Sequence, residues 1–276
     1  MEVKTKKFKK DILSWYNNNK REYSWRETND PWKILLLETI SQQTQLDRAD
    51  TYFKIFIEKF PNPNSMASSS LKQVLSLWSG LGYNNRAKRL HESSKILSKT
   101  GFDKLYPNFE VLPGVGPYTN NAILSFAYRE KVITIDTNIN RVISRYFGIK
   151  DTKTFLNDNT KLLLDKISSR DLNQAIMDFG SLVCKSKNPL CSICPLEKVC
   201  KKNIVNTKKK QEAFSGSNRE LRGDLLKLLL SNNKLSLKKI EKTLSVDREK
   251  LLKATTTLEK DGIITVKKNN LVEINS

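Results

Sequence analysis

Apolar residues return every three or four positions along most of the chain up to residue 184. This spacing is typical of helices that bury one face. Turn-forming sequences such as FPNPNS and YPNFEVLPG separate the apolar segments, and strands do not alternate with helices. The pattern therefore predicts a mainly α-helical fold. The predicted helices cover residues 8–18, 32–42, 48–60, 70–78, 84–98, 117–128, 138–147 and 171–184.

A second pattern begins after Cys200. The segment KKNIVNTKKKQEAFSGSN has no helical period and is rich in charge, Ser and Gly, so we expect a linker at residues 206–218. Beyond it lie three helical patterns and then two short apolar runs joined at KKNN, which is a hairpin signal. These predicted helices cover residues 219–230, 236–243 and 247–260.

Three helices and a hairpin in this order resemble a winged helix, a helix-turn-helix variant whose third helix can enter a DNA major groove. We therefore predict a helical domain over residues 1–205 and a winged-helix domain over residues 219–276. Many winged helices bind protein instead of DNA. The segment contains no evident base-reading side chain, so both kinds of partner stay open.

Charge adds information about partners. The 276 residues carry 49 Lys and Arg against 29 Asp and Glu, a formal net charge of +20. Such an excess favours a polyanionic partner, although in a lysine-rich proteome it would serve only solvation. The chain has no apolar run long enough to span a membrane, and its N-terminus does not resemble a signal peptide. We therefore expect an intracellular monomer without membrane contact.

All four cysteines fall within one segment, CKSKNPLCSICPLEKVC, with the spacing C-x6-C-x2-C-x5-C. Disulfides would be reduced in an intracellular protein, so four thiolates in one loop indicate a metal site. The spacing alone permits a structural zinc ion or an iron–sulfur cluster. The candidate ligands are Cys184, Cys191, Cys194 and Cys200.

Histidine is nearly absent from the chain. The only one, His91, lies in an amphipathic helical pattern and is expected to be structural. A His-rich zinc site is therefore excluded, and a Ser-His-Asp triad would depend on this residue alone. Any acid–base chemistry must rest on carboxylates.

The segment LPGVGPYT places two glycines around Val115, directly before a helical pattern. Gly114 and Gly116 let backbone N–H groups converge without interference from Cβ atoms, and Pro117 suits a first helical position. Amides at the start of a helix attract phosphate. We therefore expect this turn to grip a phosphate backbone.

Six segments carry a resemblance to one known family. In chain order they are PWKILLLETISQQTQ, WSGLGYNNRAKRLH, LPGVGPYT, IDTNINRVISR, LNQAIMDFGSLVC and the cysteine segment. Over about residues 8–203 the chain resembles the MutY-type adenine DNA glycosylases of the helix-hairpin-helix superfamily, which includes endonuclease III. The resemblance implies two helical lobes that hold double-stranded DNA and a flipped base between them. It also implies a 4Fe-4S cluster on the four cysteines.

Two carboxylates are the candidate catalytic groups. Cleavage of an N-glycosidic bond needs protonation of the leaving base and stabilisation of an oxocarbenium-like sugar. Glu38 lies among apolar residues in LLLETI, which should raise its pKa and suit a general acid. Asp136 opens a predicted helix, whose N-terminal dipole should lower its pKa. Taken singly, Asp136 is better explained as an ordinary N-cap and Glu38 as a tolerated half-buried residue; together with the resemblance they predict catalysis.

The resemblance also implies how the chain handles the sugar and the gap in the duplex. Tyr118 stands where endonuclease III has a lysine that attacks the sugar. Tyrosine cannot form that Schiff base, so we expect base release without strand cleavage, with simple helix packing as the rival role for Tyr118. Gln43 and Tyr83 match residues that fill the space left by the flipped base.

Further site residues are implied in the same way. Gly114, Gly116 and Asn138 are expected to contact DNA. The adenine pocket is expected to include Arg21, Trp25 and Gln174, although Trp25 could equally belong to the core.

The chain departs from the family in two places. A predicted winged helix stands where many relatives have a domain that resembles nucleotide hydrolases and recognises 8-oxoguanine. The sequence IDTN replaces the commoner D-G-N, and RVISRYFG also resembles thymine-DNA mismatch glycosylases. We therefore predict removal of adenine opposite 8-oxoguanine or guanine, with removal of thymine or uracil opposite guanine as the alternative. The non-enzymatic alternative is a winged-helix DNA-binding regulator.

Overall fold

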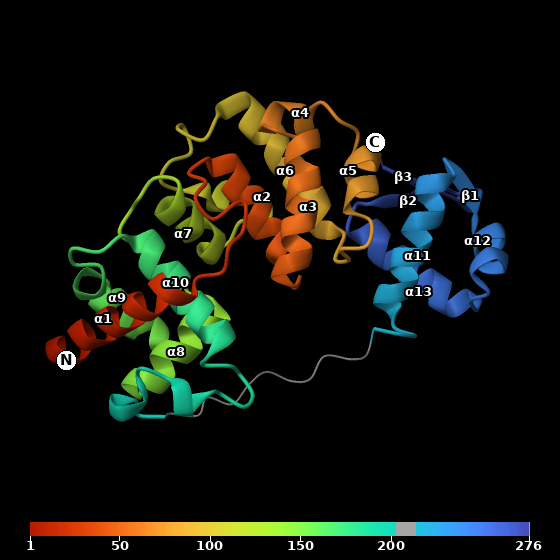
Figure 1. The fold of residues 1–276 in the computed structure, drawn as a ribbon. Coiled ribbons are helices and arrows are strands. Elements are labelled where there is room, and N and C mark those ends of the chain that lie inside the picture. Colours follow the sequence, from red (N-terminus) through yellow and green to blue (C-terminus); the bar gives the residue numbers. More distant parts are fainter. Residues whose placement is uncertain (203–213, 276) are drawn as a thin grey trace. The chain divides into compact units, whose positions relative to one another are not determined.

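The computed structural model describes residues 1–202 and 214–275. Most of the predicted linker, residues 206–213 of 206–218, lies outside the described residues. Contacts divide the chain into two compact units. The first contains Met1–Leu35 and the described part of Val115–Lys209, and the second contains Leu36–Gly114 and the described part of Lys210–Ser276. Figure 1 labels their elements.

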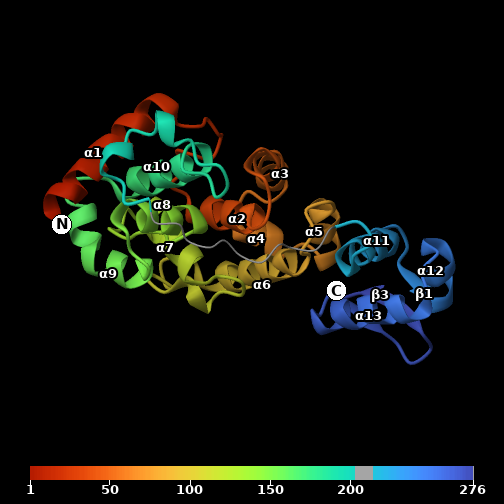
Figure 2. The same ribbon diagram turned by 90° about the horizontal axis from the view of Figure 1, so that it is seen from below.

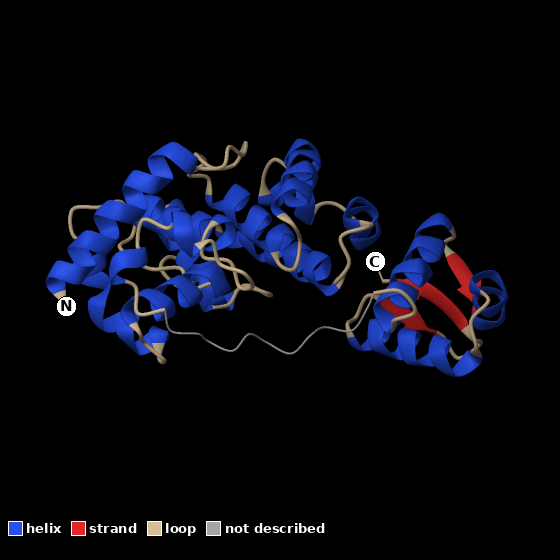
Figure 3. Cartoon of the chain, turned by 60° about the horizontal axis from the view of Figure 1, so that its bottom comes forward, coloured by secondary structure: helices blue, strands red, loops and turns tan. Residues whose placement is uncertain are grey.

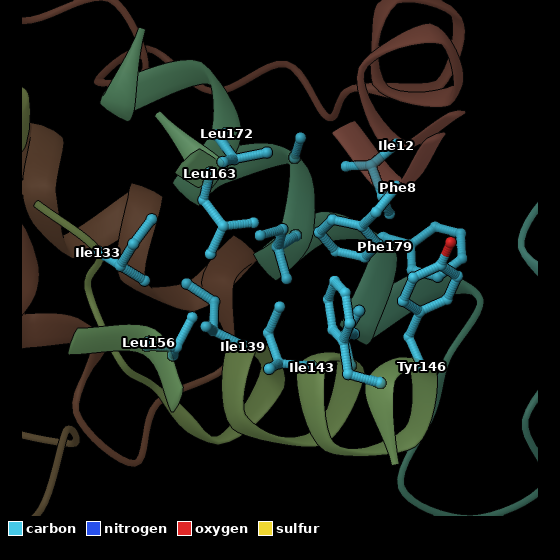
Figure 4. Close-up of a cluster of buried hydrophobic side chains, with 14 of the residues drawn as sticks. Phe8, Ile12, Ile133, Ile139, Ile143, Tyr146, Leu156, Leu163, Leu172 and Phe179 are labelled. Atoms are coloured by element: carbon cyan, nitrogen blue, oxygen red, sulfur yellow. The ribbon is translucent and has the colours of Figure 1, made fainter. Parts of the chain in front are cut away.

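The first unit is helical and is built around α10. Helix α10 contacts α1, α7 and α8, and Phe179 of α10 packs with Phe8, Ile12, Ile143 and Tyr146 in a core that excludes water (Figure 4). The cysteine segment follows α10 and contains two short 3-10 helices. The helices that lie wholly in this unit are α1 (Glu2–Asn19), α7 (Pro117–Phe126), α8 (Thr137–Phe147), α9 (Thr152–Leu163), α10 (Ser169–Leu182), η2 (Cys191–Ile193) and η3 (Glu197–Val199). Helix α2 (Pro31–Ser41) begins in this unit and ends in the second.

Helix α8 shows why the sequence folds this way locally. Ile139, Val142 and Ile143 return at helical spacing and are buried, so one face of the helix joins the core. The helix begins where the Asp136 side chain accepts a hydrogen bond from the Ile139 N–H. It ends at Gly148, whose φ of 78° is a left-handed conformation that glycine adopts without strain.

Two helices were missed by the sequence analysis. Helix α9 has only a sparse apolar pattern around Phe155 and Leu156, and its NDNT segment favours turns, yet burial against α1 and α8 stabilises it. Helix α4 (Pro63–Ala67) lies in the predicted turn FPNPNS. A reciprocal capping box between Asn62 and Ser65 starts this short helix.

The second unit has a helical half around α6. Helix α4 contacts α6, the long helix labelled in Figure 2. Trp78 of α5 packs edge-on against Phe56 of α3 at 5.6 Å between ring centroids, and both are fully buried. The other helices of this half are α3 (Leu46–Lys59), α5 (Leu71–Trp78), α6 (Asn85–Thr100) and η1 (Phe109–Val111).

The C-terminal half of the second unit has the predicted helices and hairpin, with one strand more (Figure 3). The strands form an antiparallel sheet in the order β1-β3-β2. Strand β1 was not predicted because it is only three residues long and buries one side chain, Leu235. The elements are α11 (Asn218–Ser231), β1 (Lys234–Ser236), α12 (Leu237–Leu244), α13 (Arg248–Lys260), β2 (Ile264–Val266) and β3 (Leu271–Ile274).

The mainly helical fold class predicted from the sequence is confirmed. The C-terminal elements share a unit with α3–α6, and α11 contacts α5. The boundaries predicted at residues 205 and 219 stay a prediction. Within the described part of the chain, no helix is both long and apolar enough to cross a membrane.

Candidate functional site

Asp136 is held in place at the start of α8. Its Oδ1 accepts a hydrogen bond from the Ile139 N–H at 2.6 Å, and its Oδ2 accepts one from Asn138 Nδ2 at 2.7 Å. Burial nevertheless raises the pKa of Asp136 above its ordinary value, against the lowering effect of these bonds and of Arg141. The lowered pKa expected from the helix dipole is therefore wrong, because desolvation outweighs the dipole and its N–H donors.

Arg141 connects this carboxylate to the cysteine segment. Its Nη2 donates to Asn138 Oδ1 at 2.7 Å and to the Gly180 carbonyl at 2.6 Å, while its Nε donates to the Cys184 carbonyl at 2.7 Å. Gly180 is required here, because an added Cβ would lie 2.7 Å from the Cβ of Asn138. Neither Arg141 nor Gly180 was predicted as a site residue, since only the fold brings α8 and α10 together.

Glu38 lies in the part of α2 that belongs to the second unit. Its exposed fraction is 9%, and its neighbours Leu36, Leu37 and Ile40 are also buried. The helix therefore has apolar residues around most of its circumference, as the sequence LLLETI predicted. Asp136 belongs to the first unit, and each carboxylate is described within its own unit.

The two predicted gap-filling residues share an uncommon backbone conformation. Gln43 has φ of 59° and Tyr83 has φ of 48°, and both side chains are exposed. A non-glycine residue in this left-handed region is uncommon and costs on the order of 1 kcal/mol, so the surrounding structure must hold it. The sequence analysis gave no reason to expect this conformation.

Arg86 binds the backbone just before Gln43 and just before Tyr83. Its Nη1 donates to the carbonyls of Thr39 and Ile40 at 3.0 Å and to that of Gln42, which immediately precedes Gln43. Its Nη2 donates to the carbonyls of Leu81 at 3.2 Å and Gly82 at 3.0 Å, just before Tyr83.

The guanidinium of Arg86 is also packed between rings. It lies 4.9 Å from the Trp78 ring centroid and 5.7 Å from that of Tyr83. Burial lowers its pKa to about 10, so it stays charged at neutral pH. Arg86 occurs in the motif WSGLGYNNRAKRLH but was not predicted as a site residue. The sequence gave one indication of its role: this charged residue lies on the same helical face as the apolar Leu90.

The glycines of LPGVGPYT differ from each other. Gly114 has φ of 84°, and an added Cβ would lie 3.1 Å from the Cβ of Arg89. Gly116 is the N-cap of α7 in extended conformation, and nothing lies within 4 Å of an added Cβ. Local sterics therefore require glycine at position 114 but not at 116, which corrects the expectation that both positions exclude a side chain for the same reason. Tyr118, on the first turn of α7, is half-buried.

The predicted base-pocket residues Arg21 and Gln174 meet in one network of the first unit. Asp178, 2% exposed, accepts from Arg21 at 2.5 Å and from Arg26 at 3.0 Å. Gln174 Oε1 accepts from Arg26 at 3.0 Å and from the Tyr16 hydroxyl at 2.8 Å. Arg26 and Asp178 were not predicted, although they organise the network.

The third predicted pocket residue, Trp25, lies beside this network. Its ring stacks on Tyr23 with an interplanar angle of 8° and a centroid distance of 5.0 Å. The Arg26 guanidinium lies 5.4 Å from the Trp25 ring. The Trp25 Nε1 is buried and has no hydrogen-bond acceptor among the described residues. A buried donor without an acceptor costs free energy unless a ligand supplies one.

The four cysteines line one cavity of about 350 Å³. Arg145 lies at its wall, donates to the carbonyls of Lys185 at 2.6 Å and Ser186 at 3.1 Å, and approaches the Cys184 sulfur at 3.5 Å. Within residues 1–202 and 214–275, no three His, Cys, Asp or Glu side chains are arranged to hold a single metal ion. Burial raises the pKa of the Cys194 thiol to about 11.

The chain is similar to known DNA base excision repair proteins. Residues 37–164 match the model of the HhH-GPD superfamily base excision DNA repair proteins. An adenine DNA glycosylase of Buchnera aphidicola is 37% identical over 211 residues, 72% of this chain, and the chain spans only 59% of that relative's length. An adenine DNA glycosylase of Mycobacterium tuberculosis is 32% identical over 234 residues, 79% of this chain and 77% of that relative.

Solved structures show the same fold. A thermostable thymine-DNA glycosylase matches with a TM-score of 0.66 and 28% identity, over 72% of this chain and 95% of that one. Endonuclease III in a trapped covalent intermediate with DNA matches with a TM-score of 0.63 and 21% identity, over 73% of this chain and 96% of that one. From the identity to the mycobacterial relative over most of both chains, the chain belongs to the adenine DNA glycosylase family of the HhH-GPD base excision DNA repair proteins.

Proposed function

We propose that the protein removes mispaired adenine from double-stranded DNA by hydrolysis of the N-glycosidic bond. The observation that carries this proposal is the similarity to adenine DNA glycosylases over most of the chain, with Glu38 and Asp136 inside the matched residues. The geometry of Asp136 supports the proposal, because two donors hold this half-buried carboxylate in one orientation. The preferred opposite base, 8-oxoguanine or guanine, is part of the proposal.

The two carboxylates take different roles. Glu38 is the general acid that protonates the leaving base, and its side chain is 9% exposed on α2. Asp136 is the carboxylate that stabilises the positive charge on the sugar as the bond breaks. Asn138 and Ile139 keep its two oxygens oriented before the substrate arrives. Water then adds to the anomeric carbon of the sugar and releases one proton, which returns Glu38 to its protonated form.

The protein leaves the strand intact in this proposal. Tyr118 supplies no amine for a Schiff base with the sugar, so the product is an abasic site. Strand breaks are then expected only after alkali or heat treatment.

DNA contacts are proposed for the turn at Gly114 and Gly116, for Asn138, and for the exposed Gln43 and Tyr83. Extrusion of a base leaves a gap that costs a few kcal/mol of lost stacking, and exposed amide and aromatic side chains offset part of it. The left-handed backbone of Gln43 and Tyr83 supports this role, because such conformations cluster at ligand-binding and active sites. The net charge of +20 supports phosphate contact in general.

The proposed adenine pocket includes Arg21, Trp25 and Gln174. The indole N–H of Trp25 is buried without an acceptor, and the acceptor nitrogens of an adenine ring would satisfy it. Arg26 and Asp178 complete the pocket wall by fixing Arg21 and Gln174. Trp25 would then bind the base rather than serve only as core.

The four cysteines are proposed to hold a 4Fe-4S cluster. All four cysteines line one cavity of about 350 Å³, and this shared cavity supports the proposal. When bound, the cluster supplies iron–thiolate bonds that fix the loop between Cys184 and Cys200. Protein purified under low oxygen should contain about four iron atoms per chain with acid-labile sulfide, whereas stoichiometric zinc without sulfide would contradict the assignment.

Removal of thymine opposite guanine is the second candidate. One observation favours it: the thymine-DNA glycosylase is 28% identical to this chain, which covers 95% of its length.

The C-terminal elements of the second unit have the order of a winged helix, and a DNA-binding role for them is proposed under either candidate.

The deciding experiment measures base release from duplexes that differ in one mispair. Adenine opposite 8-oxoguanine, adenine opposite guanine, thymine opposite guanine and uracil opposite guanine are compared under single-turnover conditions. We expect adenine release to exceed thymine and uracil release by at least about 100-fold. Fast thymine release with no adenine release would overturn the proposal in favour of the second candidate, and no release from any duplex would refute both.

A further inference from the structure

A group of aromatic and cationic side chains from two parts of the second unit lies at the loop of Tyr83. Arg219, in the first turn of α11, donates from Nη1 to the Tyr83 hydroxyl at 3.2 Å. The same guanidinium lies 5.9 Å from the ring centroid of Phe214. Tyr83 is 39% exposed and Phe214 is 58% exposed, so one cation lies between two rings that both reach the surface.

The contact between Arg219 and Tyr83 is one of several between the C-terminal elements and α5–α6. Asp261, the C-cap of α13, accepts from Arg222 of α11 at 2.9 Å and from Asn85 of α6 at 3.3 Å. Asn85 is two residues after Tyr83. These bonds tie the start of α11 to the start of α6.

Two more contacts lie along the same surface. Lys72 of α5 donates to Asn233, after α11, at 2.8 Å. Gly262, with φ of 66°, leaves room for the Lys88 side chain, because an added Cβ would lie 3.0 Å from its Cε. The position of Arg219 beside Tyr83 therefore follows from the packing of the second unit and not from one exposed hydrogen bond.

Flat rings and guanidinium planes at the surface are suited to one kind of ligand. Proteins bind unstacked nucleobases by stacking them on aromatic side chains and on arginine. This stacking does not depend on which of the bases is bound. The C-terminal elements are basic, since residues 214–275 carry 13 Lys and Arg against eight Asp and Glu. A free aromatic amino acid or an acidic peptide would use only part of this arrangement.

We infer that Phe214 and Arg219, together with Tyr83, form a stacking platform for a nucleobase that has left the duplex stack beside the flipped base. The inference rests on the proposed function, in which Tyr83 enters the gap. It assigns a DNA contact to the C-terminal elements that does not involve α13, the helix expected to enter a groove. Phe214 supplies the outer ring of the platform, and Arg219 joins this ring to the one supplied by Tyr83.

The test uses the full-length protein and a duplex with a stable abasic analogue at the target position, so that it needs no base release. The fluorescent base 2-aminopurine is placed, one position at a time, opposite the analogue and at the two neighbouring positions of that strand. Wild-type protein should change the fluorescence at one of these positions. Phe214→Leu, which keeps apolar bulk but removes the ring, and Arg219→Ala should abolish most of that change.

Matched controls separate the platform from general charge and folding. Phe214→Tyr keeps the ring and should behave like wild type. Lys227→Ala removes one positive charge from α11 about 12 Å further along the helix and should leave the fluorescence change intact. Phe214→Leu and Arg219→Ala should each weaken binding by roughly five- to 100-fold, with thermal unfolding midpoints close to that of wild type.

Equal fluorescence changes and affinities in wild type, Phe214→Leu and Arg219→Ala would overturn the platform. So would equal losses in Arg219→Ala and Lys227→Ala, because that outcome indicates only charge. Base release by wild type from a mispair panel is scored separately. A protein that releases adenine but shows no platform effect retains the proposed function without this inference.

Discussion

Asp136 differs from Gln43 and Tyr83 in what its neighbours must stabilise. At Asp136 it is a partly desolvated charge, and at Gln43 and Tyr83 it is an unfavourable backbone conformation. Asp136 is half-buried, and its neighbours orient a charge that desolvation disfavours. Gln43 and Tyr83 are exposed, and their neighbours hold a backbone conformation that an isolated chain disfavours. In each region an arginine connects the residue to distant backbone: Arg141 joins α8 to α10 and the cysteine segment, and Arg86 joins α2 to the loop before α6.

The difference shows where each region should be sensitive. Substitutions at the carboxylates should affect the chemical step and leave folding nearly intact. Substitutions behind the loops should affect stability and DNA binding first, because these loops have no chemical role in the proposed function. The following experiments test this division.

The largest effect is expected at the two carboxylates. Glu38→Gln and Asp136→Asn remove a proton donor or a charge with little change in shape, so each should lower single-turnover base release by at least about 100- to 10,000-fold. Binding to the same duplex should stay within a few-fold of wild type. Near-wild-type rates in both folded variants would refute the roles given to Glu38 and Asp136.

The next effect is expected at Arg86. Arg86→Ala leaves carbonyls at the end of α2 and before Tyr83 without their charged donor, so the free energy of unfolding should fall by about 2–4 kcal/mol. DNA affinity should fall as well. Arg86→Lys keeps the charge but loses the forked geometry and should lie in between.

The control for Arg86 is Lys95→Ala, an exposed position on the same helix, which should change the free energy of unfolding by less than about 0.5 kcal/mol. Denaturant unfolding and titration of a fluorescent duplex measure both quantities. Equal stability of Arg86→Ala and wild type would show that Arg86 does not hold the loops.

A smaller effect is expected at Gly180. Gly180→Ala forces its Cβ against Asn138, so Asn138 and with it Asp136 should shift, at a cost of about 1–3 kcal/mol in stability and several-fold in base release. Gly223→Ala is the matched control on α11, where nothing lies within 4 Å of the added Cβ. That substitution should stabilise the protein by about 0.5–1 kcal/mol. A similar gain in both variants would contradict the tight contact at Gly180.

The smallest effect concerns pH. The pKa of Asp136 is raised on folding, so this group favours the folded state fully below its ordinary pKa, and this contribution is lost as pH rises through the folded value. Asp136→Asn does not titrate. Its unfolding midpoint relative to wild type should therefore rise from acid pH towards neutrality. A difference that does not change with pH would indicate an unshifted carboxylate.

The sequence by itself determined much of the fold. Apolar residues at helical spacing located α2, α3, α5–α8 and α10 to within two residues at each end, and α1 without its first six residues, because burial of one face is encoded in the local pattern. The order of elements after residue 217 was also readable, since turn residues and short apolar runs are local signals. The mainly helical fold and the family followed from these patterns and from six motifs in order.

The site depended more on tertiary structure. Sequence placed Asp136 at a helix start but gave the wrong direction for its pKa, because burial is a property of the packed molecule. It missed Arg86 and Asp178, whose partners lie far away along the chain. Helices α4 and α9 and strand β1 were missed because their local patterns are weak and packing stabilises them. Local chemistry is encoded in neighbouring residues, whereas desolvation and long-range hydrogen bonds exist only once distant segments have packed together.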